Sequence, residues 1–278
     1  MRIPKSGIGF FDSGIGGLTV LTECANLLQG ETLYYYGDNA HAPYGNLETK
    51  LIRTRVEKAF RRFQSLQAKA VVIACNTVTA LLADELRLRY SFPIIGAEPA
   101  VLPAAKVSGE IFVLTTRATF QSPRLQNLIE RAKQEYPTAN FRLTPCERLA
   151  GEIECHVGER GYDYTPYLPQ GNPTAVVLGC THYLYIKEYI KAHYGCEVFD
   201  GNAGIARRLV SVLAENSLES RDERPLYSPN ACEKGSKNPE NGNNKQGNTL
   251  KNTVYCIGSG RKINRKILES GYEQMFVL

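Results

Sequence analysis

Length, composition and charge exclude several classes of protein before any motif is considered. The 278 residues suffice for one large α/β domain or for two domains of half that size. With 43% hydrophobic and 22% charged residues, the composition is that of a soluble globular protein, and no apolar run approaches the roughly 18 residues of a membrane span. The chain enters an apparent strand within its first residues, which leaves no room for a secretion signal, so we expect a cytoplasmic protein.

Cysteines, histidines and basic residues give no sign of a metal site or of a nucleic-acid surface. The eight cysteines are dispersed and form no CxxC pair, so neither a disulfide framework nor a zinc site is expected. The four histidines show no metal-ligand spacing. The net charge of +5 is modest, and the basic residues between positions 53 and 62 fit the solvated face of one helix better than a nucleic-acid contact.

The first part of the chain alternates between strand and helix patterns, which is typical of a parallel sheet. Apolar runs bounded by turn residues predict four strands, over residues 7–12, 32–37, 69–75 and 93–96. The stretches between them predict three helices, over residues 16–28, 48–67 and 77–90.

A second series repeats this order of elements. Its strands are predicted over residues 110–115, 140–144, 174–179 and 196–199. Its helices are predicted over residues 121–135, 146–158, 183–194 and 203–216. The first strand of this series follows that of the first series by 103 residues, so we expect a duplicated α/β architecture.

The repeated series divide the chain into two domains and a C-terminal segment that returns to the first domain, over residues 1–97, 98–209 and 210–278. A strand over 253–257 and a helix over 261–270 are predicted within that segment. Residues 228–252 are rich in Asn, Gly, Lys and Pro, which predicts a flexible surface insertion.

Two cysteines that stand 105 residues apart follow nearly the same short sequence, AVVIACNT at Cys75 and AVVLGCTH at Cys180. An apolar, β-branched run before a thiol predicts a buried strand that delivers the thiol to its C-terminal end, where open α/β sheets bind their ligands. Packing in the core is the ordinary explanation of a single free cysteine. Because hydrogen-bonding residues follow both thiols, we interpret the pair as functional.

A matched pair of weak acids from two related halves suits racemisation, because each face of the reacting carbon then has its own acid and base. One thiolate removes the proton while the opposite thiol delivers another. No lysine stands in a context typical of pyridoxal phosphate, so we expect chemistry without a cofactor. A free thiol has a pKa of about 8.5 and needs a neighbour to act as a base near neutrality. His182 and Asp12 are the candidates for that neighbour.

Asp12 stands at the end of the first predicted strand, before the glycines of Ser13-Gly-Ile-Gly-Gly17. Its carboxylate could also simply cap the next helix. The glycines leave backbone N–H groups free for an anionic group, but they lack the spacing of a dinucleotide-binding loop. The polar loop over residues 37–45 is either a lid or wall of the site or an ordinary connection.

These motifs resemble those of the cofactor-independent aspartate/glutamate racemase superfamily, and within it those of the glutamate racemases. The resemblance spans nearly the whole chain and is carried by FDSGIGGLTV at 11–20, YYGDNAHAPYG at 35–45, ACNTVTA at 74–80, GAEPA at 96–100 and LGCTHY at 178–183. It implies two similar parallel-sheet α/β domains related by a pseudo-two-fold axis, with the active site in the cleft between them.

The resemblance also assigns the site residues. It implies that Cys75 and Cys180 are the two acid/bases, acting on D- and L-glutamate respectively, and that Asp12 and His182 assist them. A further catalytic glutamate is expected near residues 146–155, where we take Glu152 first and Glu154 as its alternative. The residues expected to hold the substrate are Asp12, Ser13, Tyr44, Gly45, Asn76, Thr77, Thr181 and His182.

By the same resemblance, the product is D-glutamate for bacterial peptidoglycan synthesis. A homodimer and activation by a muramyl peptide occur among relatives, and the residues leave both open. Two alternatives remain: a racemase of aspartate or another amino acid, and a non-catalytic amino-acid-binding regulator. A redox disulfide between the two thiols is disfavoured by the absence of a CxxC motif.

Overall fold

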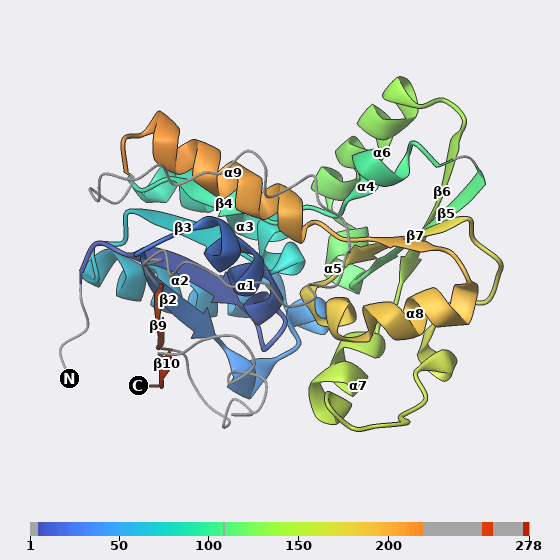
Figure 1. Cartoon of the computed structure of the whole chain (residues 1–278), viewed down its shortest axis with the longest axis horizontal. Helices are drawn as coiled ribbons and strands as arrows, with labels where there is room; N and C mark the ends of the chain where they lie inside the picture. Colours follow the sequence, from blue (N-terminus) through green and yellow to red (C-terminus); the bar gives the residue numbers. More distant parts are fainter. Residues whose placement is uncertain (1–4, 108, 219–251, 258–274, 278) are drawn as a thin grey trace, which may run out of the picture.

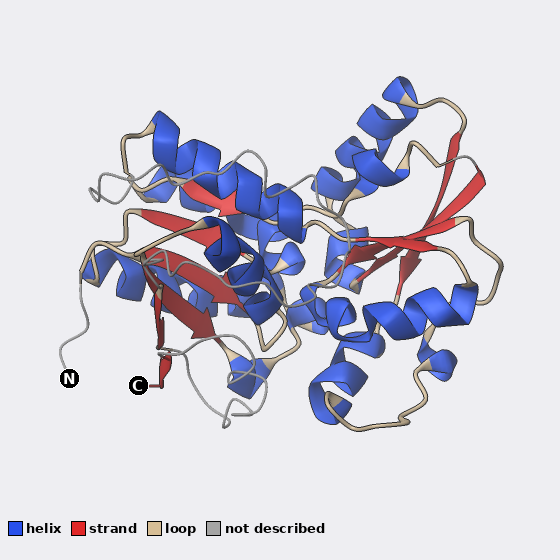
Figure 2. Cartoon of the chain, in the orientation of Figure 1, coloured by secondary structure: helices blue, strands red, loops and turns tan. Residues whose placement is uncertain are grey.

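The chain forms two parallel β-sheets that stand side by side, each covered by helices (Figure 1, Figure 2). The computed structural model describes residues 5–107, 109–218, 252–257 and 275–277. The insertion predicted over 228–252 lies outside these ranges except for its last residue, and the helix predicted over 261–270 lies outside them entirely.

The first sheet has six parallel strands in the order β10-β9-β2-β1-β3-β4. Their bounds are β1 (Ile8–Asp12), β2 (Thr32–Gly37), β3 (Ala70–Ile73), β4 (Ile94–Gly96), β9 (Thr253–Cys256) and β10 (Met275–Val277). Helices cover both faces, so the central strands read as continuous apolar runs. One face is covered by α1 (Gly17–Leu27) and α9 (Asn202–Glu215), the other by α2 (Thr49–Ser65) and α3 (Asn76–Arg89).

The second sheet repeats the strand order of the first. Its four parallel strands lie in the order β6-β5-β7-β8, with bounds β5 (Gly109–Thr115), β6 (Ala139–Pro145), β7 (Ala175–Gly179) and β8 (Glu197–Phe199). One face is covered by α4 (Val101–Ala104) and α6 (Pro123–Glu135), the other by α7 (Leu149–His156) and α8 (Lys187–Tyr194). In the first sheet β3, which leads to Cys75, lies between β1 and β4, and in the second sheet β7, which leads to Cys180, lies between β5 and β8. The two parallel-sheet α/β domains confirm the predicted fold class.

The elements differ from the prediction mainly around the two cysteines. The strand expected to reach Cys75 ends at Ile73, and Cys75 instead forms the N-cap of α3. The helix expected over 183–194 is divided into a 3-10 segment, η4 (Thr181–Ile186), and α8. Within η4 the buried Tyr183 hydroxyl donates to two backbone oxygens, those of Thr115 and Cys146, which fixes the tight turn after Cys180.

Helix α9 packs on the first sheet (Figure 1). Its buried residues between Ile205 and Leu213 share one core with α1, β1 and β2. The domain boundary predicted at residue 209 divides this helix. Because a helix with one continuous buried face packs as a unit, we infer that the second domain ends before α9, after β8.

Asn252 ties the returning C-terminal segment to the first domain. Its side-chain nitrogen donates to the backbone oxygens of Ala25 and Leu28 at the end of α1, at 2.8 and 2.9 Å. Its side-chain oxygen accepts from the backbone N–H of Glu31 at 2.9 Å. One amide therefore satisfies three backbone groups at the point where β9 joins the sheet.

Replacing Asn252 by Ala should lower the free energy of unfolding by about 2 kcal/mol, because the three backbone groups lose their partner. Urea denaturation followed by circular dichroism measures this change. The matched control is Asn127→Ala, at an exposed position of α6, where a change within about 0.5 kcal/mol is expected. Equal stabilities of the two variants would show that this contact does not hold the segment.

Candidate active site

Both paired cysteines are buried at the carboxyl ends of middle strands. Cys75 follows β3 and Cys180 follows β7, and the two residues are 4% and 6% exposed. The apolar sequences before them place each thiol at the edge of its sheet where parallel strands end. The two edges meet, because the hydroxyl of Thr181 in the second domain donates to the carboxylate of Asp12 in the first, at 3.3 Å.

Asp12 lies in the contact between the domains and is fully buried. Its Oδ2 accepts from the backbone N–H groups of Gly14 and Gly17, at 3.2 and 2.9 Å, at the start of α1. The carboxylate therefore caps this helix and also faces the second domain. Its interpretation as a helix cap is thus compatible with its interpretation as a site residue. Burial raises its pKa, against the opposing effects of His182 and the two N–H groups.

The glycines after Asp12 allow the domains to approach closely. A Cβ atom at Gly16 would overlap the hydroxyl of Thr181, and one at Gly14 would lie 2.9 Å from Nε2 of His182. The hydroxyl of Tyr185 in η4 donates to the backbone oxygen of Ile15 at 2.8 Å. Glycine is needed at these positions because backbone of one domain packs on side chains of the other.

The thiol of Cys75 donates to the hydroxyl of Ser13 at 3.6 Å. Burial, and then the carboxylate of Asp12, raise the pKa of this thiol to about 12, with a smaller contribution from Cys180. The thiol is therefore protonated at neutral pH in these surroundings. A cation placed beside it would favour the thiolate.

Cys180 has a different support, made of an imidazole and a carboxylate. Its sulfur lies 3.7 Å from Nδ1 of His182, and Nε2 of His182 lies 2.5 Å from a carboxylate oxygen of Glu154. Burial opposes the charge of His182, but the hydrogen bonds with Cys180 and Glu154 raise its pKa well above the usual value. In such an arrangement the carboxylate orients the imidazole, and the imidazole exchanges a proton with the thiol.

The structure places Glu154, rather than the predicted Glu152, in the site. Glu152 accepts from the hydroxyl of Tyr162 at 2.7 Å and pairs with Arg148, and these contacts lower its pKa. Both glutamates lie on α7. Two positions along an α-helix separate side chains by about 200°, so the two residues face opposite directions. Their spacing could not decide which of them faces His182.

The residues that follow Cys75 also reach the second domain. The hydroxyl of Thr77 lies 2.9 Å from that of Thr116, the N-cap of α5 (Arg117–Phe120). Among the residues that the structure describes, the buried side-chain oxygen of Asn76 has no hydrogen-bond partner, so it can accept from a ligand. Thr116 was not among the predicted residues. The sequence feature that could have indicated it is its position directly after β5, which corresponds to the position of Ser13 directly after β1.

Tyr44 and Gly45 belong to a loop that contacts both domains, as expected for a wall of the site. They lie in a short 3-10 turn, η2 (Tyr44–Asn46), and Tyr44 is 1% exposed. A Cβ atom at Gly45 would lie 2.8 Å from Cβ of Thr116. The side chain of Asn46 donates to the backbone oxygen of Glu147 at 3.1 Å.

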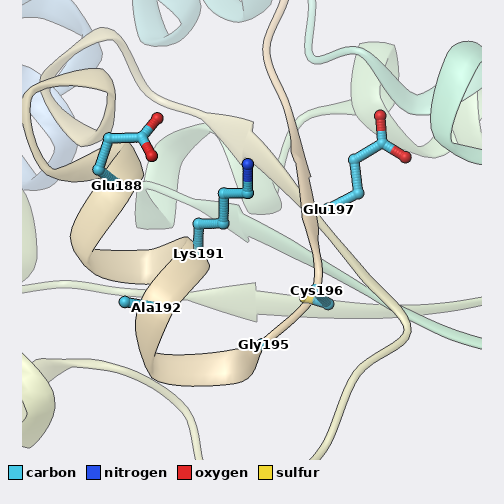
Figure 3. A pocket seen from close by; sticks show the side chains of 6 residues that line it. All are labelled: Glu188, Lys191, Ala192, Gly195, Cys196 and Glu197. Atoms are coloured by element: carbon cyan, nitrogen blue, oxygen red, sulfur yellow. The ribbon is translucent and has the colours of Figure 1, made fainter.

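A separate hollow of about 710 Å³ lies beside α8 and contains none of the predicted site residues. Figure 3 shows the charged side chains of Glu188, Lys191 and Glu197 at its walls, together with Cys196. These charged residues are exposed, so the hollow lacks the buried polar groups that mark the thiol site.

Within residues 5–107, 109–218 and the two short C-terminal stretches, no three His, Cys, Asp or Glu residues are grouped so as to hold a metal ion. Across the same part of the chain, no helix combines the length and apolar character needed to cross a membrane.

The geometry brings together two buried thiols from opposite domains, each with its own proton-handling neighbours. Asp12 and Ser13 accompany Cys75, and His182 with Glu154 accompanies Cys180. Such a pair can remove a proton from one side of a bound molecule and deliver a proton from the other.

Comparisons with known proteins agree with this chemistry. The family model of Asp/Glu/Hydantoin racemases matches residues 16–209. A glutamate racemase of Clostridium perfringens is 38% identical over 234 residues, which cover 80% of this chain and 88% of that protein.

Solved structures show the same arrangement of domains. A glutamate racemase from Bacillus anthracis superposes with a TM-score of 0.72 at 24% identity, over 98% of this chain and 97% of that one. The Escherichia coli glutamate racemase, solved in complex with L-glutamate and the activator UDP-MurNAc-ala, gives a TM-score of 0.70 at 25% identity, over 99% and 98% of the two chains. By its sequence, its fold and its paired thiols, the chain belongs to the Asp/Glu racemase family.

Proposed function

We propose that this protein is a glutamate racemase that interconverts L- and D-glutamate by proton transfer between two thiols. The observation that carries the proposal is the pair of buried cysteines at equivalent strand ends of the two domains, each beside a different acid/base group. The 38% identity to a glutamate racemase over most of both chains supports glutamate as the substrate.

In the D-to-L direction, the thiolate of Cys75 accepts the α-proton of D-glutamate. The thiol of Cys180 then donates its proton to the opposite face of the carbanion, which gives L-glutamate, a Cys75 thiol and a Cys180 thiolate. In the L-to-D direction the two residues exchange roles. The protonated His182, held by Glu154, stabilises the Cys180 thiolate and can return a proton to it.

The positive charge of the substrate explains how the Cys75 thiolate is stabilised in this mechanism. The pKa of Cys75 is about 12 beside the carboxylate of Asp12, so the thiolate needs a compensating cation. The substrate ammonium supplies that cation, and Asp12 and the unpartnered side-chain oxygen of Asn76 are suited to receive it. We expect donors for the substrate carboxylates from the remaining predicted residues, which are Ser13, the backbone of Tyr44 and Gly45, Thr77, Thr181 and His182.

The D-glutamate product fits peptidoglycan synthesis, which is the role consistent with this family. We place the protein in the bacterial cytoplasm, where amino-acid precursors of the cell wall are made. We also propose that the protein forms a homodimer. Sedimentation of the purified protein tests this directly.

The function is tested by incubating the protein with L-glutamate in D2O without an added cofactor. We expect optical rotation to fall to zero while deuterium enters the α-position, because each delivered proton comes from solvent-exchanged thiols. Cys75→Ser and Cys180→Ser should each lower the racemisation rate by about 10²–10⁴-fold, the usual contribution of a general acid or base. The exposed Cys155→Ser on α7 is the control and should racemise normally.

Several outcomes would contradict the proposal. Unimpaired racemisation in either active-site serine variant would exclude the two-thiol mechanism. Deuterium exchange with L-aspartate but none with L-glutamate would show that aspartate, and not glutamate, is the substrate. Exchange with neither amino acid, despite binding, would favour a regulator that binds amino acids without catalysis.

The geometry around His182 predicts a difference between two neighbouring glutamates. Glu154→Gln should lower kcat at least tenfold, because His182 loses the carboxylate that holds it protonated. Glu152→Gln should leave kcat within about twofold, since Glu152 contacts Tyr162 and Arg148 instead. Initial rates in both directions provide the measurement. A larger loss of kcat in the Glu152 variant would show that Glu152, and not Glu154, is the catalytic glutamate.

We propose in addition that a muramyl peptide activates the protein. In support, three arginines, Arg87, Arg124 and Arg208, line a cavity of about 490 Å³ beside β4, near the chain segment that links the domains. Arg124 on α6 pairs with Glu98 of that segment and with Asp84 of α3. An anionic ligand that competes for these arginines would act on the connection between the domains.

Adding UDP-MurNAc-ala at low glutamate concentration should therefore raise the racemisation rate severalfold. Arg208→Ala, at a largely exposed side chain, should keep the basal rate and lose the increase. No increase with the wild-type protein would reject the activator. An increase that survives the arginine substitution would reject this cavity as its site.

A further inference from the structure

Asp38 is a buried carboxylate directly beside the site, and the mechanism above assigns it no role. It follows β2, and its residue is 4% exposed. Its backbone N–H donates to the backbone oxygen of Asp12 at 3.1 Å. Asp38 is therefore fixed to the strand end that carries the site, and its side chain points toward the loop over residues 39–47.

Among the described contacts, the carboxylate of Asp38 accepts from the side chains of Tyr44, Arg55 and His41. The hydroxyl of Tyr44 donates to Oδ2 at 2.5 Å, and a guanidinium nitrogen of Arg55 lies 3.4 Å from the same oxygen. Nδ1 of His41 lies 2.9 Å from Oδ1. Burial, and then the hydrogen bond to Asp38, raise the pKa of the Tyr44 phenol far above its usual value, so this phenol remains a donor.

The hydrogen bond from Tyr44 fixes the orientation of a ring that has no other polar partner among the described contacts. The ring packs in the apolar core beside Phe11, with ring centroids 6.4 Å apart. A charge-assisted bond in such surroundings is stronger than an exposed one, because water does not compete for either group. The position of Tyr44 thus depends on Asp38.

The residue after Tyr44 forms the contact with the opposite domain. Gly45 packs against Thr116, whose hydroxyl is bonded to that of Thr77, the second residue after Cys75. A displacement of Tyr44 would therefore move the backbone of Gly45 and disturb the Thr77–Thr116 contact. This chain of contacts runs from Asp38 to the Cys75 side of the site.

We propose that Asp38 is a positioning residue for racemisation, which holds the Tyr44–Gly45 backbone against the second domain through the phenol of Tyr44. The inference rests on the proposed function, in which Tyr44 and Gly45 contact the substrate. It adds a residue that touches neither the substrate nor the thiols. Because the loop serves both enantiomers equally, Asp38 acts on substrate binding in both directions.

The test is a double-mutant cycle of Asp38→Asn and Tyr44→Phe. Each single variant should raise KM for both L- and D-glutamate about tenfold, which is the usual effect of losing a hydrogen bond to a charged group. The kcat values should change much less, because the thiols keep their neighbours. The double variant should match the single variants, since Asp38 acts through the phenol that Tyr44→Phe removes.

The control is Asp163→Asn, which breaks a similar bond of 2.6 Å from the Tyr189 hydroxyl. Among the described hydrogen bonds, Asp163 contacts none of the predicted site residues. It should leave KM within about twofold. An unchanged KM in Asp38→Asn, or effects that multiply in the double variant, would overturn the inference. A fall in kcat alone would also overturn it. Wild-type racemisation, measured in parallel, separates these results from a failure of the proposed function.

Discussion

The buried carboxylate of Asp12 is the group on which the rest of the site depends. It caps α1 through the N–H groups of Gly14 and Gly17, and it accepts from Thr181 of the opposite domain. A buried charge is costly unless several donors satisfy it, so both the helix start and the domain contact are needed to keep it. Burial, and then this same charge, raise the pKa of Cys75.

The two halves use the same strand order but support their thiols differently. Ser13 and Asp12 lie beside Cys75, whereas His182 and Glu154 lie beside Cys180. A racemase requires one acid/base on each side of the reacting carbon, and it does not require identical ones. The repeated fold thus provides the two equivalent positions, and the local residues give each thiol different neighbours.

The sequence predicted most of the fold because its strands are buried on both faces and read as plain apolar runs. It singled out Cys75 and Cys180 as candidate site residues because they repeat the same local pattern. It could not tell that Glu154 contacts His182 while Glu152 contacts Tyr162, because that depends on how α7 is oriented. It also missed Asp38, since one acidic residue in a turn-rich loop is equally consistent with a turn.

The sequence by itself determined the parallel strands, the duplicated order of elements and the residues at the strand ends, because these follow from local hydrophobic patterns. Only the tertiary structure decided which side chains meet across the domains, such as Thr181 with Asp12 and Thr116 with Thr77. It also decided that α9 packs with the first sheet. Such contacts depend on how two separately folded sheets pack together, which no local pattern contains.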